Sequence, residues 1–300
     1  MHLSLLFFVC LASLNVTVTF SSLGEDVKLI LSENDNLFYI APPGVDPHLY
    51  QLTPEDIKKL KNSDLIISTA HTPFEMKIRE LVSKGEIKAK LIEIPFINGI
   101  KLRKNPELNQ DIYHMPVYDP NNYEIFIKYL SEELAKLNPN NETEYKNKAE
   151  KIIEKVEQLK MKTPKLNLSG VGDFPYIPYA VSWIGINVTH LIVKEWGIPP
   201  TPGDLMKIEN DIKSGKIKIA VVTTGGSAIS NSLERIAAKY NLPILYVESP
   251  VAMKSILDKL ENISINSKNL IYAKSKSQDF DFSAVLVAVL IAIVIKRVLR

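Results

Sequence analysis

Short apolar runs alternate with amphipathic stretches along most of this chain. The apolar runs are predicted as strands at Val16–Phe20, Leu37–Ala41, Leu65–Ser68, Lys90–Ile94, Leu166–Val171, Val188–Val193, Ile217–Thr223, Ile244–Val247 and Leu270–Ala273. Stretches with helical periodicity lie between most of them, at Thr53–Asn62, Phe74–Lys84, Tyr123–Leu137, Pro202–Ser214 and Ala228–Tyr240. Alternation of strands and helices predicts an α/β fold in which parallel sheets are flanked by helices.

One predicted helix, Glu142–Lys160, differs from the others because it is highly charged and has only a narrow apolar stripe. A helix that is polar over most of its surface often bridges two domains. The body between the chain ends, roughly 260 residues, is long enough for two domains. We therefore predict two α/β lobes, residues 16–141 and 161–275, joined by a rigid helix at 142–160. An ordinary surface helix within one domain is the alternative.

Both chain ends are apolar. Residues 1–15 contain an uncharged run, HLSLLFFVCLASL, that resembles the core of a secretory signal, although the usual positive segment is missing. A buried first strand or helix is the alternative. Ser283–Ile295 is apolar on every helical face, and basic residues and a polar spacer flank it. We predict a C-terminal membrane anchor within residues 276–300, with the body outside the cell membrane.

Composition narrows the classes of function. The formal net charge is +2, from 36 basic and 34 acidic residues that are mixed along the chain, so no nucleic-acid surface is indicated. The only cysteine, Cys10, lies in the predicted signal, and the body therefore has no disulfide, thiolate metal site or cysteine nucleophile. Sequons of the form N-x-S/T fit an exported surface. We expect an extracytoplasmic body.

His48 lies in a turn-rich run directly ahead of a helix start. Pro47 has a fixed φ and restricts Asp46, so the backbone beside the imidazole is stiff. The following Thr53-Pro54-Glu55-Asp56 is typical of a helix N-terminus. Such a loop at the end of a strand is where α/β sheets bind ligands. The alternative is a structural or surface histidine.

The run around His48 resembles a known family signature. Residues 43–56 read PGVDPHLYQLTPED, and Ser63-Asp64-Leu65-Ile66-Ile67 follows. Zinc/manganese-type solute-binding proteins of metal ABC transporters have G-x-D-P-H-x-Y-x-x-T-P-x-D and then A-D-L-hydrophobic, and the resemblance extends over most of residues 16–273. It implies two α/β lobes joined by a long helix, and a metal ion held between them by three histidines and a carboxylate. It also implies a permease and an ATPase as partners.

Carried over residue by residue, the resemblance implies four metal ligands. His48 is the first. His114, in YHMPVYDP, is the second, with a spacing one residue longer than in the family. Where the family has its third histidine, the stretch VGDFPYIPYA has none, and Asp173 is the nearest side chain able to coordinate. Glu248, after the strand at Ile244–Val247, replaces the aspartate of the family.

Two further histidines are given lesser roles. His71, in STAHTPFE, follows a strand and is expected to line the cleft rather than to bind the metal directly. His190 lies in a strand-like run and is expected to be structural. A mixed set of imidazoles and carboxylates suits zinc, manganese or ferrous iron as cargo. A carboxylate in place of a histidine shifts the preference modestly towards manganese or iron.

Two rival classes of function stay open. A metal-dependent hydrolase would activate water at an open coordination position, but the chain has no H-E-x-x-H or G-x-S-x-G motif. Gly225-Gly226-Ser227 resembles a phosphate-binding turn, although a tight strand-to-helix turn is favoured. The other rival is a surface adhesin, or a receptor for a non-metal ligand, on the same scaffold. We expect a membrane-tethered, non-catalytic component of an ABC importer that captures zinc or manganese.

Overall fold

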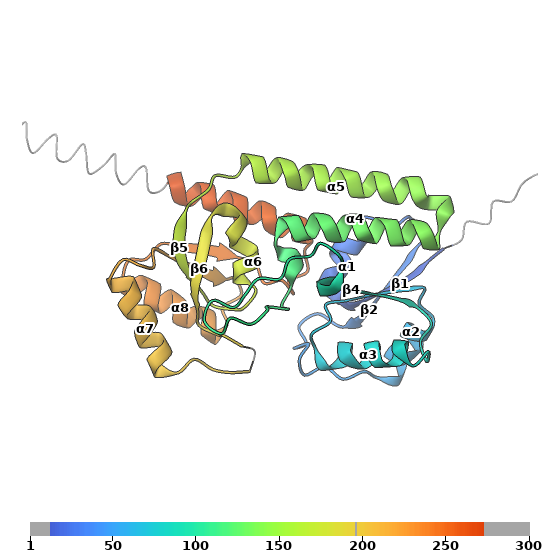
Figure 1. Ribbon diagram of the computed structural model, residues 1–300, viewed down its shortest axis with the longest axis horizontal. Helices are drawn as coiled ribbons and strands as arrows, with labels where there is room; N and C mark the ends of the chain where they lie inside the picture. The colour runs from blue at the N-terminus through green and yellow to red at the C-terminus, as the bar shows by residue number, and fades with distance from the viewer. Residues whose placement is uncertain (1–12, 196, 273–300) are drawn as a thin grey trace, which may run out of the picture.

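The computed structural model describes residues 13–195 and 197–272, and its strands form two parallel four-stranded sheets (Figure 1). The first sheet contains β1 (Asn15–Phe20), β2 (Asn36–Ala41), β3 (Leu65–Ser68) and β4 (Lys90–Glu93), in the order β2-β1-β3-β4. The second contains β5 (Leu168–Gly172), β6 (Ile186–Leu191), β7 (Ile219–Thr223) and β8 (Ile244–Val247), in the order β6-β5-β7-β8. The predicted α/β class with parallel sheets is confirmed.

Helices lie beside both sheets. Those of the first half are α1 (Ser21–Lys28), α2 (Pro54–Lys61), α3 (Pro73–Ser83) and α4 (Pro120–Leu137). Those of the second half are α6 (Ile177–Val181), α7 (Pro202–Lys213), α8 (Ala228–Lys239) and a C-terminal helix at residues 256–272. Short 3-10 turns are η1 (Ile94–Phe96), η2 (Pro116–Tyr118), η3 (Pro139–Asn141) and η4 (Ser182–Ile184). Thr-Pro dipeptides begin α2, α3 and α7, each with a capping box that satisfies backbone N–H groups of the first turn.

The charged helix α5 (Glu142–Lys162) lies along α4 and leads from the first half to the second (Figure 1). Its buried residues Tyr145, Ala149, Ile152 and Val156 are three or four positions apart, so they form one face of the helix. Mostly charged and polar residues cover the rest of its surface, with Met161 as an exposed apolar side chain. The sequence had indicated this helix from the same narrow stripe.

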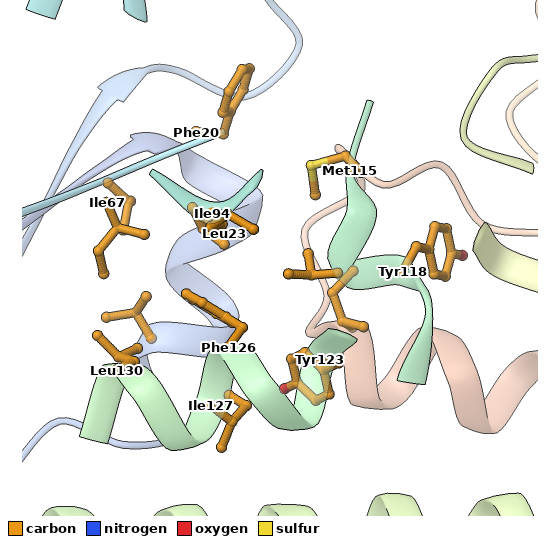
Figure 2. Packing of buried hydrophobic residues seen from close by; sticks show 14 of the residues in the cluster. Phe20, Leu23, Ile67, Ile94, Met115, Tyr118, Tyr123, Phe126, Ile127 and Leu130 are labelled. Atoms are coloured by element: carbon orange, nitrogen blue, oxygen red, sulfur yellow. The ribbon is translucent and has the colours of Figure 1, made fainter. Parts of the chain in front are cut away.

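One apolar cluster continues through both halves. It includes Val18 of β1, Phe126 of α4, Leu191 of β6 and Leu260 of the C-terminal helix, all of which are buried. Figure 2 shows part of it, with Phe126 and Leu130 of α4 pointing towards α1. A smaller cluster fills the space between β7, α7 and α8. The shared core fixes the sheets relative to each other and so positions the loops between them.

Asp26 of α1 fastens the C-terminal helix to the first half. Its Oδ1 accepts hydrogen bonds of 2.7 Å from the Tyr123 hydroxyl and 2.7 Å from the backbone N–H of Ile256. The carboxyl group is fully buried, and this burial raises its pKa to about 7 against the opposing effect of Lys259. Lys259 Nζ in turn donates to the carbonyl oxygen of Pro250 at 2.8 Å.

Two sequence predictions of secondary structure fail. The strand predicted at Leu270–Ala273 is wrong, because residues 270–272 belong to the C-terminal helix. The buried side chains Leu260, Ile263 and Ser267 recur at helical spacing and face the core. Their burial outweighs the strand-like composition of the last residues of this helix. The sequence also missed α1, which directly follows β1.

Most of the residues in the predicted signal and in the predicted membrane anchor are not described by the structure. Residues 1–12 of the signal predicted at residues 1–15, and the anchor predicted at residues 276–300, lie outside the described residues. Of the other signal residues, Leu14 is buried and Asn15 begins β1. Within residues 13–195 and 197–272, no helix is both long and apolar enough to span a bilayer.

Replacement of Tyr123 by phenylalanine tests the junction at Asp26. Tyr123→Phe removes one of the donors to a buried carboxyl group, so we expect the free energy of unfolding to fall by about 1–3 kcal/mol. Urea denaturation measures it. Tyr129→Phe is the matched control on the same helix, since the Tyr129 hydroxyl makes no hydrogen bond to the described residues. An equal loss in both variants would contradict a special role for Asp26.

Candidate metal centre

Three histidines converge between the two halves of the molecule. His48 lies on the loop after β2, His71 on the loop after β3, and His114 just before η2. One ligand nitrogen from each lies within 4.8 Å of the other two. The ring centroids are 5.4 Å apart for His48 and His71, 5.7 Å for His48 and His114, and 4.7 Å for His71 and His114. We refer to these residues as the histidine triad.

Parallel pairing explains why two of these loops meet. Strands β2 and β3 both pair with β1 in parallel, so their carboxyl ends lie at the same edge of the sheet. His71 and His114 also stand beside residues with left-handed backbone, Ala70 with φ of 62° and Met115 with φ of 50°. Non-glycine residues in this region cost of order 1–3 kcal/mol and cluster at functional sites.

Asp46 orients the first imidazole. Its Oδ1 accepts a 2.9 Å hydrogen bond from the backbone N–H of His48 and lies 3.3 Å from Nδ1 of the same residue. Because an ionised carboxylate only accepts, Nδ1 carries the proton in this arrangement. Nε2 is then the nitrogen able to bind a metal, with the carboxylate behind the ring.

A hydroxyl relay orients the second imidazole. Nδ1 of His71 is 3.0 Å from Oγ1 of Thr69, which donates its single proton to Glu75 at 2.8–2.9 Å. The hydroxyl oxygen must therefore accept from Nδ1–H, which leaves the lone pair of Nε2 for a metal. Burial opposes ionisation of Glu75, but His71 and the hydroxyl and N–H donors around the carboxylate outweigh it and lower its pKa.

Burial keeps the imidazoles of His71 and His114 neutral. Burial, and then the neighbouring His71 and His48, lower the pKa of His114 to about 3. Its Nε2 is buried and has no hydrogen-bond partner among the described residues. Burial also lowers the pKa of His71, although Glu75 opposes the shift. Since the neutral imidazole is the form that coordinates, His71 and His114 are prepared for a cation at neutral pH.

The structure places Asp173 in a different role. Its buried carboxylate accepts hydrogen bonds from the Thr223 backbone N–H at 2.7 Å, the Thr223 hydroxyl at 2.9 Å and the Ser230 hydroxyl at 2.8 Å. Burial raises its pKa, and these donors oppose that shift. Asp173 thus ties the end of β5 to β7 and α8. It is not one of the grouped ligands.

Glu248 also has other partners. Its Oε1 accepts hydrogen bonds of 2.7 Å from Lys254 Nζ and of 2.7 Å from Asn262 Nδ2. Its backbone oxygen accepts a 2.7 Å hydrogen bond from the Tyr118 hydroxyl, which links it to the first half. The structure thus brings His48 and His114 of the predicted set together with His71, whereas Asp173 and Glu248 make the contacts described above. His71 follows β3 as His48 follows β2, and this shared position was the signal available in the sequence.

Two spaces border the histidine triad. A cavity of about 230 Å³ lies between it and the second half, where Phe174, Tyr176 and the turn after β7 form the wall. A groove of about 630 Å³ also touches all three imidazoles and is lined by Asp111 and Glu195. The groove gives a hydrated cation a polar route to the histidines.

The low pKa of His114 predicts a stability change with pH. Its folded pKa of about 3 lies below the ordinary value of about 6.5, so its contribution to stability is present above pH 6.5 and is lost as the pH falls towards 3. We expect the metal-free protein to lose about 2 kcal/mol from this residue between pH 7 and pH 5. Urea titrations of wild type and His114→Gln measure the difference. An unchanged pH slope in the variant would contradict the assignment.

Known proteins are similar to this chain in both sequence and fold. The family model for zinc-uptake complex component A, periplasmic, matches residues 16–262. A metal ABC transporter substrate-binding lipoprotein of Lactococcus lactis is 24% identical over 266 residues, covering 83% of this chain and 82% of the relative. The manganese ABC transporter substrate-binding lipoprotein PsaA of Streptococcus pneumoniae is 25% identical over 247 residues, or 77% and 78% of the two chains.

A solved structure agrees in fold. The solute-binding protein FpvC of Pseudomonas aeruginosa, in complex with Ni²⁺, has a TM-score of 0.71 at 18% identity and covers 89% of this chain and 98% of that one. The family match extends over both sheets and all three histidines of the triad. The predicted resemblance is therefore confirmed, and this chain belongs to the family of the periplasmic zinc-uptake component A, solute-binding proteins of ABC importers and not enzymes.

Proposed function

We propose that this protein is the extracytoplasmic component of an ABC importer and captures one divalent transition metal on His48, His71 and His114. The observation that carries the proposal is the convergence of three imidazoles within 4.8 Å, on loops that the first sheet positions. Three protein nitrogens with an open further position form a coordination set that Zn²⁺ readily accepts. The metal is cargo, to be passed to a permease and its ATPase.

The donor set favours zinc over manganese. Imidazole suits zinc and its late transition-metal neighbours, whereas carboxylates and water suit manganese. With Asp173 and Glu248 engaged elsewhere, the grouped candidate ligands found among the described residues are imidazoles. This reverses the modest preference for manganese or iron that a mixed set had indicated.

Negative charge behind the imidazoles supports cation binding. Asp46 lies against His48, and Glu75 reaches His71 through Thr69, with a direct separation of 3.8 Å between Glu75 Oε2 and His71 Nδ1. Carboxylates in such positions orient the ring and raise the basicity of the coordinating nitrogen. Two formal charges thus face a dication without occupying its coordination positions.

Delivery and tethering extend the proposal to the membrane. Relatives named as ABC transporter substrate-binding lipoproteins support a permease and an ATPase as partners. Tethering of this chain through residues 276–300 rests on the apolar run Ser283–Ile295 alone. The proposal of metal capture does not depend on the kind of anchor.

Removal of one imidazole tests the ligand set. We expect the wild-type protein to bind Zn²⁺ one-to-one, and His71→Ala to weaken binding by more than the ~10–100-fold typical of residues behind a ligand. Calorimetry or competition with a chromophoric chelator measures the affinity. Glu248→Gln is the control and is expected to bind like wild type, because the carboxylate contacts Lys254 and Asn262.

The opposite pattern would contradict the histidine triad. If His71→Ala kept wild-type affinity and Glu248→Gln lost it, the carboxylate-containing set implied by the family resemblance would be correct.

The relay behind His71 makes a second prediction. Thr69→Val removes the hydroxyl that holds Nδ1 of His71, so we expect Zn²⁺ affinity to fall about 10–100-fold. Thr72→Val is the matched control, since the Thr72 hydroxyl donates to the same carboxylate of Glu75 without contacting an imidazole. Calorimetry of both variants, with unfolding curves to correct for stability, compares them. Equal losses of affinity would show that Glu75 matters only for folding of the loop.

A further inference from the structure

The cavity beside the histidine triad has two chemically different walls. The first half provides imidazole nitrogens. Aromatic rings form part of the opposite wall, where Phe174 and Tyr176 stack with centroids 5.8 Å apart and planes inclined by 14°. Among the described residues that line this cavity, none carries a carboxylate, an ammonium or a guanidinium group. Among the described residues, the second half therefore presents no charged side chain to this cavity, whereas Lys194 and Glu195 line the neighbouring groove.

Several polar groups of the opposite wall act as donors. Thr223 and Ser230 already donate to Asp173. Gly225 and Gly226 follow β7 with φ of 114° and 68°, and their backbone N–H groups make no hydrogen bond within the described part of the chain. This turn leads into α8, a helix of 12 residues with Ser227 as its N-cap. Backbone donors at the start of a helix favour a negatively charged group.

The cavity exceeds the space that a metal ion and its water need. Its volume is about 230 Å³, whereas one water occupies about 30 Å³ of liquid volume. Three imidazoles leave at least one position of a tetrahedral ion open. A space of this size, with aromatic rings on one side, suits an organic molecule of several non-hydrogen atoms better than a group of waters.

We infer that the metal is held together with a small organic co-ligand, a carboxylate chelator of amino-acid size that spans the cavity. Its nitrogen or oxygen donor completes the coordination of the ion on the histidine triad. Its carboxylate lies against the turn at Gly225, and its body lies against Phe174 and Tyr176. The inference rests on the proposed function and specifies the form in which the cargo is bound.

This arrangement connects the cargo to the second half of the protein. A ligand shifts a conformational equilibrium only through contacts that differ between the two states. The grouped candidate ligands of a bare ion, His48, His71 and His114, all belong to the first half. The co-ligand supplies the contact through which the second half responds to loading.

Equilibrium dialysis of the full-length protein tests the inference. Radiolabelled L-histidine and, separately, L-malate are the probes, each with and without one equivalent of Zn²⁺. We expect one probe to be retained one-to-one with protein only when Zn²⁺ is present, and native mass spectrometry to show the ternary complex.

A cavity-filling variant locates the co-ligand. Val251 lines the cavity and is 50% exposed, so a larger side chain there can be tolerated by the fold. Val251→Trp is expected to weaken probe retention at least about tenfold while Zn²⁺ binding without a probe stays at the wild-type level. Ile265→Trp is the matched control on the C-terminal helix, where the side chain is 54% exposed and lies outside the cavity.

The outcomes separate this inference from the proposed function. Zinc binding that requires His71, with neither probe retained, would overturn the co-ligand and leave metal capture intact. Retention that is equal in Val251→Trp and Ile265→Trp would overturn its placement in the cavity. Absence of zinc binding by the wild-type protein would overturn the proposed function itself.

Discussion

The buried carboxylate of Glu75 is the interaction on which the site depends. It accepts hydrogen bonds from the hydroxyls of Thr19 at 2.7 Å, Ser68 at 3.0 Å and Thr72 at 2.8 Å, and from the backbone N–H of Thr69 at 2.7 Å. These donors come from β1, the end of β3 and the start of α3. A buried charge is tolerated only when it is fully hydrogen-bonded, so the carboxylate holds these segments in one arrangement. Ala70, whose backbone is left-handed, lies in the loop that the Glu75 carboxylate holds in place.

A second buried carboxyl group, that of Asp26, holds together segments that are further apart in the sequence. Asp26 joins α1 to α4 through Tyr123 and to the C-terminal helix through Ile256. The adjacent segment at residues 248–251 is held by Lys259, and part of it lines the cavity beside the histidines. The wall opposite the triad is therefore connected to the first half through hydrogen bonds as well as through the shared apolar core. We therefore expect a change in the packing between the two halves to alter the cavity beside the histidine triad, and the reverse.

The candidate ligands match the family signature at only some positions. His48 and His114 occupy positions that match the family signature, and the structure brings them together. Asp173 and Glu248 were assigned by alignment of motifs, but a motif does not reveal which partners a carboxylate has already found. Asp173 accepts three hydrogen bonds from Thr223 and Ser230, and Glu248 contacts Lys254. From the sequence, His71 was expected to line the cleft rather than to bind the metal directly.

The sequence by itself determined the fold class, the family and the start of α2. Each of these depends on local or periodic information: apolar spacing along β1 and α5, the Thr-Pro cap of α2, and the run around His48. Only the tertiary structure decided which side chains meet. His71 and His114 are 43 positions apart in the printed sequence, and the parallel order β2-β1-β3 with the turn before η2 brings their rings within 4.7 Å of each other. That proximity depends on burial and on strand pairing between distant segments, which periodicity along the chain does not encode.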